Sequence, residues 1–175
     1  MRNTRLTLMI VTALVAVLAL GSISAAAKPA AKGDSIVDVA LAANAQSGEF
    51  SILIAALQAA DPNVIRTLDG VGRFSVFAPT DAAFAALLAE LGVTADELLA
   101  NEALVSSVLL YHVVRGNRDS ADVLESNRIR TMNGGFLFQS GGVLTDANGR
   151  TANIVATDIE ASNGVIHVID RVVLP

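Results

Sequence analysis

The fold is decided by the stretch Ser75-Val-Phe-Ala-Pro-Thr-Asp-Ala-Ala-Phe84. Its first half is an apolar strand pattern. Because side chains alternate along a strand, Val76 and Ala78 should face one side of a sheet and Phe77 the other. Pro79 should end the strand, since proline cannot donate a backbone hydrogen bond to a neighbouring strand.

A helix should begin directly after this strand. Thr80 stands at the N-cap position, and Asp81 places a carboxylate in the first turn, where the helix dipole favours it. Phe84 lies one turn further along, on the side that should face the core. The stretch therefore predicts a strand-to-helix corner that holds the domain together.

A second informative stretch is Asn163-Gly-Val-Ile-His-Val-Ile-Asp-Arg-Val-Val-Leu-Pro175. Asn163-Gly164 is a turn signal in which the glycine should supply a positive φ. Residues 165–169, which include His167, are apolar on both faces and predict a central strand. Asp170 marks the exit from that strand.

These two stretches, with Tyr111-His112 between them, resemble the signature segments of the fasciclin (FAS1) domain, an extracellular adhesion and interaction module. The match departs from the family pattern where Leu174 meets Pro175 with no residue between them. The resemblance covers residues 34–175. It implies an α+β fold, a compact wedge of antiparallel β-strands with helices packed at one side.

Residues 1–27 have the features of a secretory signal peptide, namely a basic start, an apolar run over residues 6–20 and three alanines before Lys28. The apolar run is shorter than the ~20 residues that span a bilayer as a helix. An uncleaved membrane anchor is the alternative. Residues 28–33 are expected to form a short flexible lead into the domain.

Charge narrows the possible partners. Two of the 12 basic side chains and none of the 17 acidic ones lie in residues 1–27, so the rest of the chain has 10 basic groups and a net charge of −7. This disfavours nucleic acid and anionic membrane surfaces, which attract clustered positive charge. With no cysteine, an exported domain of this kind must be stable without disulfide bonds.

The order of elements also indicates an α+β domain. Helices are expected at 36–47, 50–61, 82–91, 94–99 and 102–110, with a short strand at 112–114 and a helical turn at 121–125. Asp69-Gly70 predicts a hairpin between strands at 64–68 and 74–78. Three Asn-Gly pairs, at 133, 148 and 163, predict three further hairpins that form an antiparallel sheet.

The chain is poor in catalytic groups. It has two histidines and no cysteine, which excludes thiol chemistry and zinc fingers. It also lacks a Gly-x-Ser-x-Gly elbow and a phosphate-binding loop. His112 and His167 both lie in apolar sequence, where a neutral, hydrogen-bonded structural imidazole is expected. We expect a non-enzyme without a metal or cofactor.

The resemblance also implies contact residues. In animal fasciclin-domain adhesion proteins, integrin binding has been assigned to segments that correspond here to Tyr111-His112 and to Asp158-Ile159. The function expected is a secreted or cell-surface, non-catalytic module that mediates adhesion or matrix contact by binding an extracellular protein or glycan. The alternative is a carrier of a small apolar ligand such as a carotenoid, because some fasciclin-domain relatives bind carotenoids and this chain is rich in aliphatic residues.

Overall fold

The structure, a computed structural model, describes residues 33–175. The expected signal peptide, at residues 1–27, lies outside the described residues, as does the expected lead except for Gly33. Within the described part of the chain, no helix is both long enough and apolar enough to cross a bilayer.

The helices begin and end at the capping signals in the sequence. Ser35 forms a capping box with Asp38, and Gly48 and Gly92 end two helices in the left-handed conformation. The bounds are α1 (Ile36–Ser47), α2 (Ser51–Ala59), α3 (Pro62–Leu68), α4 (Asp81–Leu91), α5 (Ala95–Leu99), α6 (Glu102–Tyr111) and α7 (Ser120–Glu125).

Seven strands form one sheet in the order β2-β1-β7-β6-β5-β4-β3. They are β1 (Phe74–Pro79), β2 (Val113–Arg115), β3 (Arg128–Arg130), β4 (Phe136–Ser140), β5 (Val143–Thr145), β6 (Thr151–Ala161) and β7 (Gly164–Ile169). Neighbours are antiparallel except β1 and β7, which are parallel. A bridge from Val114 to Thr131 brings the two ends of the sheet together, so the sheet curls toward a barrel.

The three hairpins predicted from Asn-Gly pairs are confirmed as β3–β4, β5–β6 and β6–β7. The fourth predicted hairpin is wrong. Residues 64–68 belong to helix α3, which begins at the N-cap Asp61 with Pro62 in its first turn. The start signal Asp-Pro outweighs the β-branched residues and the Asp-Gly pair that follow.

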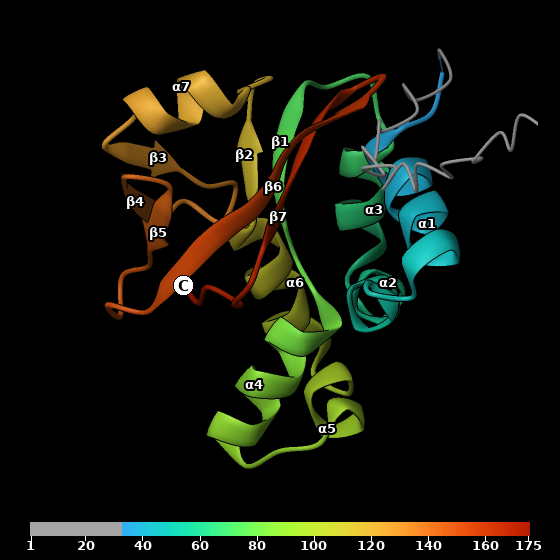
Figure 1. Cartoon of the computed structure of the whole chain (residues 1–175). Coiled ribbons are helices and arrows are strands. Elements are labelled where there is room, and N and C mark those ends of the chain that lie inside the picture. Colours follow the sequence, from blue (N-terminus) through green and yellow to red (C-terminus); the bar gives the residue numbers. More distant parts are fainter. Residues whose placement is uncertain (1–32) are drawn as a thin grey trace, which may run out of the picture.

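Two buried clusters meet at strand β1. Val76 and Ala78 belong to the larger cluster, beneath helices α1 to α6, whereas Phe77 belongs to the smaller one inside the curl of the sheet. This is the alternation that the sequence predicts. Figure 1 shows α1–α3 on one side of β1 and β7, β3–β5 and α7 on the other, and α4 and α5 beyond the lower end of β1. The fold is α+β, and β7 is central, as expected.

Candidate functional site

The corner after β1 connects two helices. The Thr80 hydroxyl accepts a hydrogen bond from the Ala83 N–H at 3.2 Å and caps α4. The Asp81 carboxylate instead reaches α2, where it accepts from the N–H groups of Ile52 at 2.8 Å and Ser51 at 3.1 Å. Because the N-cap residue of α2 is Phe50, which supplies no side-chain cap, Asp81 serves as that cap from another element.

The remaining corner residues lie in the core. Phe84 is buried in the larger cluster. Pro79 is the last residue of β1 and is paired in register with Ile169 of β7. The following residue, Thr80, still donates its N–H to the Ile169 carbonyl at 3.3 Å. The corner therefore has a structural role along its whole length.

Asn163 joins three segments through its side-chain amide. Its Oδ1 accepts from the Ile36 N–H at 2.8 Å, at the start of α1, while its Nδ2 donates to the carbonyls of Leu68 and of Gly70, the latter at 3.1 Å. The side chain is buried. Asn163, which the sequence predicts only as a turn residue, therefore connects α1, the end of α3 and the start of β7 through buried hydrogen bonds.

The expectation that Gly164 supplies a positive φ is wrong. Its φ is not positive, because it already lies in β7, opposite Ala161, and the hairpin loop consists of Ser162 and Asn163. Glycine is needed there for space. A Cβ at this position would collide with the backbone oxygen of Phe74 and would lie 2.8 Å from Cδ1 of Ile36.

His112 directly follows α6, and its side chain is buried. Its Nδ1 donates to the Val108 carbonyl at 2.8 Å, and its Nε2 accepts from the Val173 N–H at 3.3 Å. Both ring nitrogens are therefore occupied in the neutral form. Burial lowers the pKa of His112 from 6.5 to about 4.

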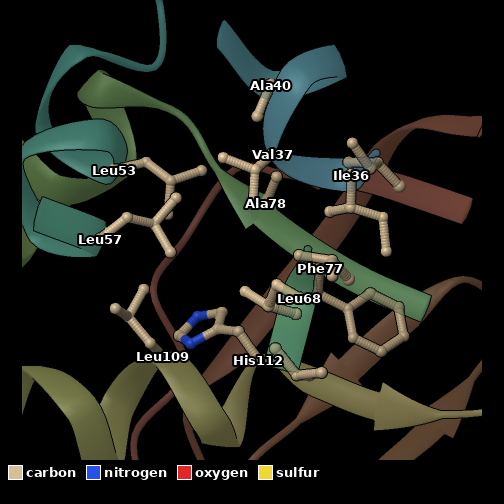
Figure 2. A pocket seen from close by; sticks show the side chains of 13 residues that line it. Ile36, Val37, Ala40, Leu53, Leu57, Leu68, Phe77, Ala78, Leu109 and His112 are labelled. Atoms are coloured by element: carbon tan, nitrogen blue, oxygen red, sulfur yellow. The ribbon is translucent and has the colours of Figure 1, made fainter. Parts of the chain in front are cut away.

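A small cavity of about 30 Å³ lies beside this imidazole, beneath α1. Figure 2 shows the His112 ring next to Leu109, with Leu57 and Leu68 among the other side chains that line the space. The lining is aliphatic apart from Phe77 and the imidazole. A space of this size, lined in this way, can hold neither a substrate nor a network of water molecules.

His167, in β7, is fully buried and lies against Phe77, with ring centroids 5.6 Å apart. Its Nε2 donates to the Arg118 carbonyl at 2.9 Å, and its Nδ1 accepts from the Asp158 N–H at 3.4 Å. These partners differ from those of His112, so the two imidazoles do not share a site.

Tyr111 is also fully buried, in the smaller cluster. Its hydroxyl donates to the Phe136 carbonyl at 2.7 Å and accepts from the Ala147 N–H at 3.3 Å. Burial raises the pKa of this hydroxyl. The side chains of Tyr111 and His112 are thus enclosed, and neither is presented to a partner in this structure.

Asp158 and Ile159 lie in an irregular part of β6, where the register with β7 shifts. Asp158 is exposed and has a φ of 60°, a left-handed conformation for a residue other than glycine. Its carboxylate accepts from the Ser120 N–H at 2.8 Å. Although burial acts to raise it, the hydrogen bonds from Ser120 hold the pKa of Asp158 below its ordinary value. Ile159 packs against the larger cluster.

Asp170 closes the strand pair beside it. Its two carboxylate oxygens accept from the backbone N–H and the side-chain amide of Asn153, each at 2.7 Å. Its own N–H donates to the Asn153 carbonyl at 3.1 Å. Asp170 therefore fixes the register between β7 and the start of β6.

Sequence reasoning missed Asp146, which is buried. One carboxylate oxygen accepts from the N–H groups of Asn148 at 2.8 Å and Arg150 at 2.9 Å, and the other accepts from the Leu174 N–H at 2.8 Å. The turn Asp-Ala-Asn-Gly signals the first two contacts, because aspartate often bonds the backbone two residues on. No local signal indicates the third, which holds the final segment.

An apolar pocket of about 220 Å³ lies between α2, α4, α5 and α6. Aliphatic side chains and one phenylalanine line it, and two of them, Leu91 and Leu104, are 47% and 41% exposed. The full lining is Ala56, Phe84, Leu87, Leu91, Leu98, Leu104, Val105, Val108, Leu109 and Leu174. The pocket has no polar group that could perform chemistry.

Two further features of the described residues bear on metal binding and on buried polar atoms. Among residues 33–175 no group of three or more histidine, aspartate or glutamate side chains is placed to hold a metal ion. In the same part of the chain, every buried side-chain nitrogen and oxygen has a hydrogen-bond partner.

The chain is similar in sequence to several known bacterial proteins. The chain is 39% identical to protein sll1483 of Synechocystis over 87% of this chain and 81% of that one. It is 35% identical to immunogenic protein MPB70 of Mycobacterium bovis over 82% of this chain and 72% of that one. The cell surface glycolipoprotein MPB83 of Mycobacterium bovis is 34% identical over 66% of this chain and 49% of its own length.

Among solved structures, a FAS1 domain pair from the insect cell adhesion molecule fasciclin I superposes with a TM-score of 0.59 at 18% identity. The match covers 73% of this chain and 46% of that one. It shows the shared fold. The fasciclin domain profile matches residues 48–175. The chain belongs to the fasciclin domain family.

Proposed function

We propose that this chain is an exported, non-catalytic module of the cell surface or its surroundings, and that it mediates adhesion or matrix contact by binding a protein or a glycan. Membership of the fasciclin family carries the proposal. The relatives include a protein named for the cell surface, and the matched structure comes from a cell adhesion molecule. Both support a module of the cell-surface, adhesion type.

The use of the signature side chains supports a non-catalytic role. Asp81 caps a helix, Asn163 connects three segments, and each histidine has both ring nitrogens in hydrogen bonds. A general base must be able to reach the proton that it removes. Imidazoles enclosed in this way, in the neutral form, lack that access.

Within the proposed contact segments, Asp158 is the side chain available to a partner. It is exposed on β6, whereas Ile159 packs inward and Tyr111 and His112 are enclosed. The backbone of Asp158 has a positive φ, and the hydrogen bond from the Ser120 N–H holds its carboxylate in position. We therefore propose Asp158, with the neighbouring backbone of β6, as a contact in protein binding.

A solid-phase adhesion assay tests the proposed function. The purified chain is immobilised and tested for binding to cells and to cell-envelope and matrix fractions, and a strain that lacks the protein is tested for attachment. We expect saturable binding and weaker attachment of the deletion strain. Absence of binding to every fraction, together with unchanged attachment, would rule the function out. Asp158→Ala, compared with Asp122→Ala, tests the contact residue.

The apolar pocket supports a second candidate, a carrier of a small apolar ligand. Its volume of about 220 Å³ lies below the range of roughly 300–1,000 Å³ that is typical of ligand pockets. A whole carotenoid therefore does not fit without movement of α4 or α5, but one end of such a molecule does. Expression in a carotenoid-producing host tests this: a visible absorption band that co-purifies supports the carrier, and a colourless protein eliminates it.

A further inference from the structure

Strands β3 and β4 present an arginine–phenylalanine surface to solvent. In their antiparallel register Arg128 is paired with Phe138, and Arg130 with Phe136. The intervening residues, Ile129 and Leu137, point the other way and are buried. The guanidinium carbon of Arg128 lies 4.2 Å from the centre of the Phe136 ring, so this arginine is stacked on an aromatic face.

A third arginine adjoins this surface. Val114 of β2 forms an antiparallel bridge with Thr131, so the next pair along in that register is Arg115 and Arg130, both of which are exposed. Like charges opposite each other across two strands are destabilising. Within residues 33–175, the structure records no ion pair for Arg115, Arg128 or Arg130, since both recorded ion pairs belong to Arg150.

Where β3, β4, β5 and the start of β6 pair with one another, the solvent-facing residues other than the arginines include no acid: they are Phe136, Phe138, Ser140, Val143, Thr145, Thr151 and Asn153. The acidic residues of β6, Asp158 and Glu160, lie further along the strand, where it pairs with β7. The whole chain has a net charge of −5. A local group of uncompensated guanidinium ions in an acidic protein therefore marks this sheet face as distinct from the rest of the surface.

We infer that the outer face of β3 and β4, formed by Arg115, Arg128, Arg130, Phe136 and Phe138, binds an anionic polysaccharide that carries carboxylate or sulfate groups. The inference rests on the proposed function and names the partner class within it. Guanidinium groups hold carboxylate and sulfate oxygens through paired, charge-assisted hydrogen bonds. Phe138, which is 47% exposed, offers an apolar ring against which the C–H face of a sugar can pack.

Charge complementarity selects this partner over the alternatives. An anion between Arg115 and Arg130 would relieve their mutual repulsion, and a neutral glycan would not. The proposed location at the cell surface or in its surroundings favours a polysaccharide over nucleic acid, and the DNA control below tests this choice. Outward charges on an edge strand can instead serve to prevent edge-to-edge aggregation. That role predicts aggregation of arginine variants with unchanged affinity for saccharides.

The test is a binding titration of the full exported chain at low and at physiological ionic strength. The probes are alginate oligosaccharides for carboxylate, heparin oligosaccharides for sulfate, dextran as the neutral control and single-stranded DNA as the nucleic-acid control. The double variant Arg128→Gln/Arg130→Gln is compared with Arg66→Gln/Arg171→Gln, which removes the same charge from two exposed arginines outside this surface. Phe138→Ser tests the ring contact, and light scattering monitors aggregation.

We expect binding to at least one of the two anionic saccharides and none to dextran, with affinity reduced tenfold or more by the β3 double variant, because it removes two charge-assisted contacts. The control double variant should retain its affinity. Relative binding to alginate and heparin then separates carboxylate from sulfate recognition. Higher salt should weaken the interaction.

Four results would overturn the inference: no binding to either anionic saccharide, equal loss in the control variant, DNA binding as tight as saccharide binding, or aggregation of the β3 variant with unchanged affinity. The proposed function is judged separately. If the chain adheres to cell or matrix fractions but binds no anionic saccharide, adhesion stands and this partner does not. If it adheres to nothing, the function itself fails.

Discussion

At the scale of the residue, Asn163 shows how much stability one buried amide can carry. Asn163→Ala would leave the Ile36 N–H and the carbonyls of Leu68 and Gly70 without their partner. Each unsatisfied buried group costs about 1–3 kcal/mol, so we expect a loss of roughly 3 kcal/mol or more in the free energy of unfolding. Urea denaturation measures it. The exposed Asn117→Ala is the control, and an equal, small effect of both changes would mean that the connection is unimportant.

His112 gives the protein a predictable dependence on pH. Burial lowers the pKa of His112 to about 4, so the unfolded chain, with the ordinary value of 6.5, binds more protons between these limits. Stability therefore rises with pH in this window. It should be fully present above pH 6.5 and decline as the pH falls to 4, by about 3 kcal/mol for this group.

Urea unfolding at a series of pH values and constant ionic strength checks this dependence, and NMR titration of the assigned His112 ring assigns it to the residue. We expect the ring resonances to stay unchanged above pH 5. A His112 ring that titrates near 6.5 in the folded protein would contradict the structure, because it would place the imidazole in contact with solvent.

At the scale of the element, the start of α2 depends on a carboxylate from α4. Asp81→Ala should remove the acceptor for the N–H groups of Ser51 and Ile52 and destabilise the protein by about 1–2 kcal/mol. Hydrogen exchange should become faster at these two amides. Asp96→Ala, in the exposed first turn of α5, is the matched control and should leave both amides unchanged. Unaltered exchange in Asp81→Ala would show that water caps α2 equally well.

Most elements could be predicted from the sequence because their signals are local. The helices expected at 36–47 and 82–91 are α1 and α4, which begin after the caps Ser35 and Thr80 and end at Gly48 and Gly92. Helix α3 could not be predicted reliably, since its seven residues include Val64, Ile65 and Thr67, which favour strands. There the cap at Asp61 and tertiary packing decide the conformation.

At the scale of the whole molecule, the contacts that close the fold carry no local signal. The parallel pairing of β1 with β7 joins Phe74 to Gly164, and no turn motif specifies an association between residues so far apart in the chain. The glycine at 164 is recognisable in the sequence, but the reason for it, the approach of the Phe74 carbonyl, is visible only in three dimensions. The signature residues can thus be recognised in the sequence, whereas Asp146 and the partners of these residues in three dimensions cannot.

Asp146 allows a prediction about closure of the molecule. Its carboxylate connects the β5–β6 turn to Leu174, which lines the apolar pocket, while the adjacent Val173 N–H bonds to His112. Asp146→Ala should therefore release the segment 172–175 as well as loosen the turn. We expect a loss of about 2–3 kcal/mol, since three partly buried N–H groups lose their acceptor.

Two measurements separate release of this segment from a general loss of stability. Fluorescence of an apolar dye should rise under conditions in which the protein remains folded, because departure of Leu174 opens the pocket. Hydrogen exchange at the Val173 amide, which bonds to His112, should also become faster. Asp122→Ala, an exposed carboxylate on α7, is the control. If Asp146→Ala lowers stability without either change, the carboxylate holds only its own turn, and the final segment is kept in place by burial of Val172 and Val173.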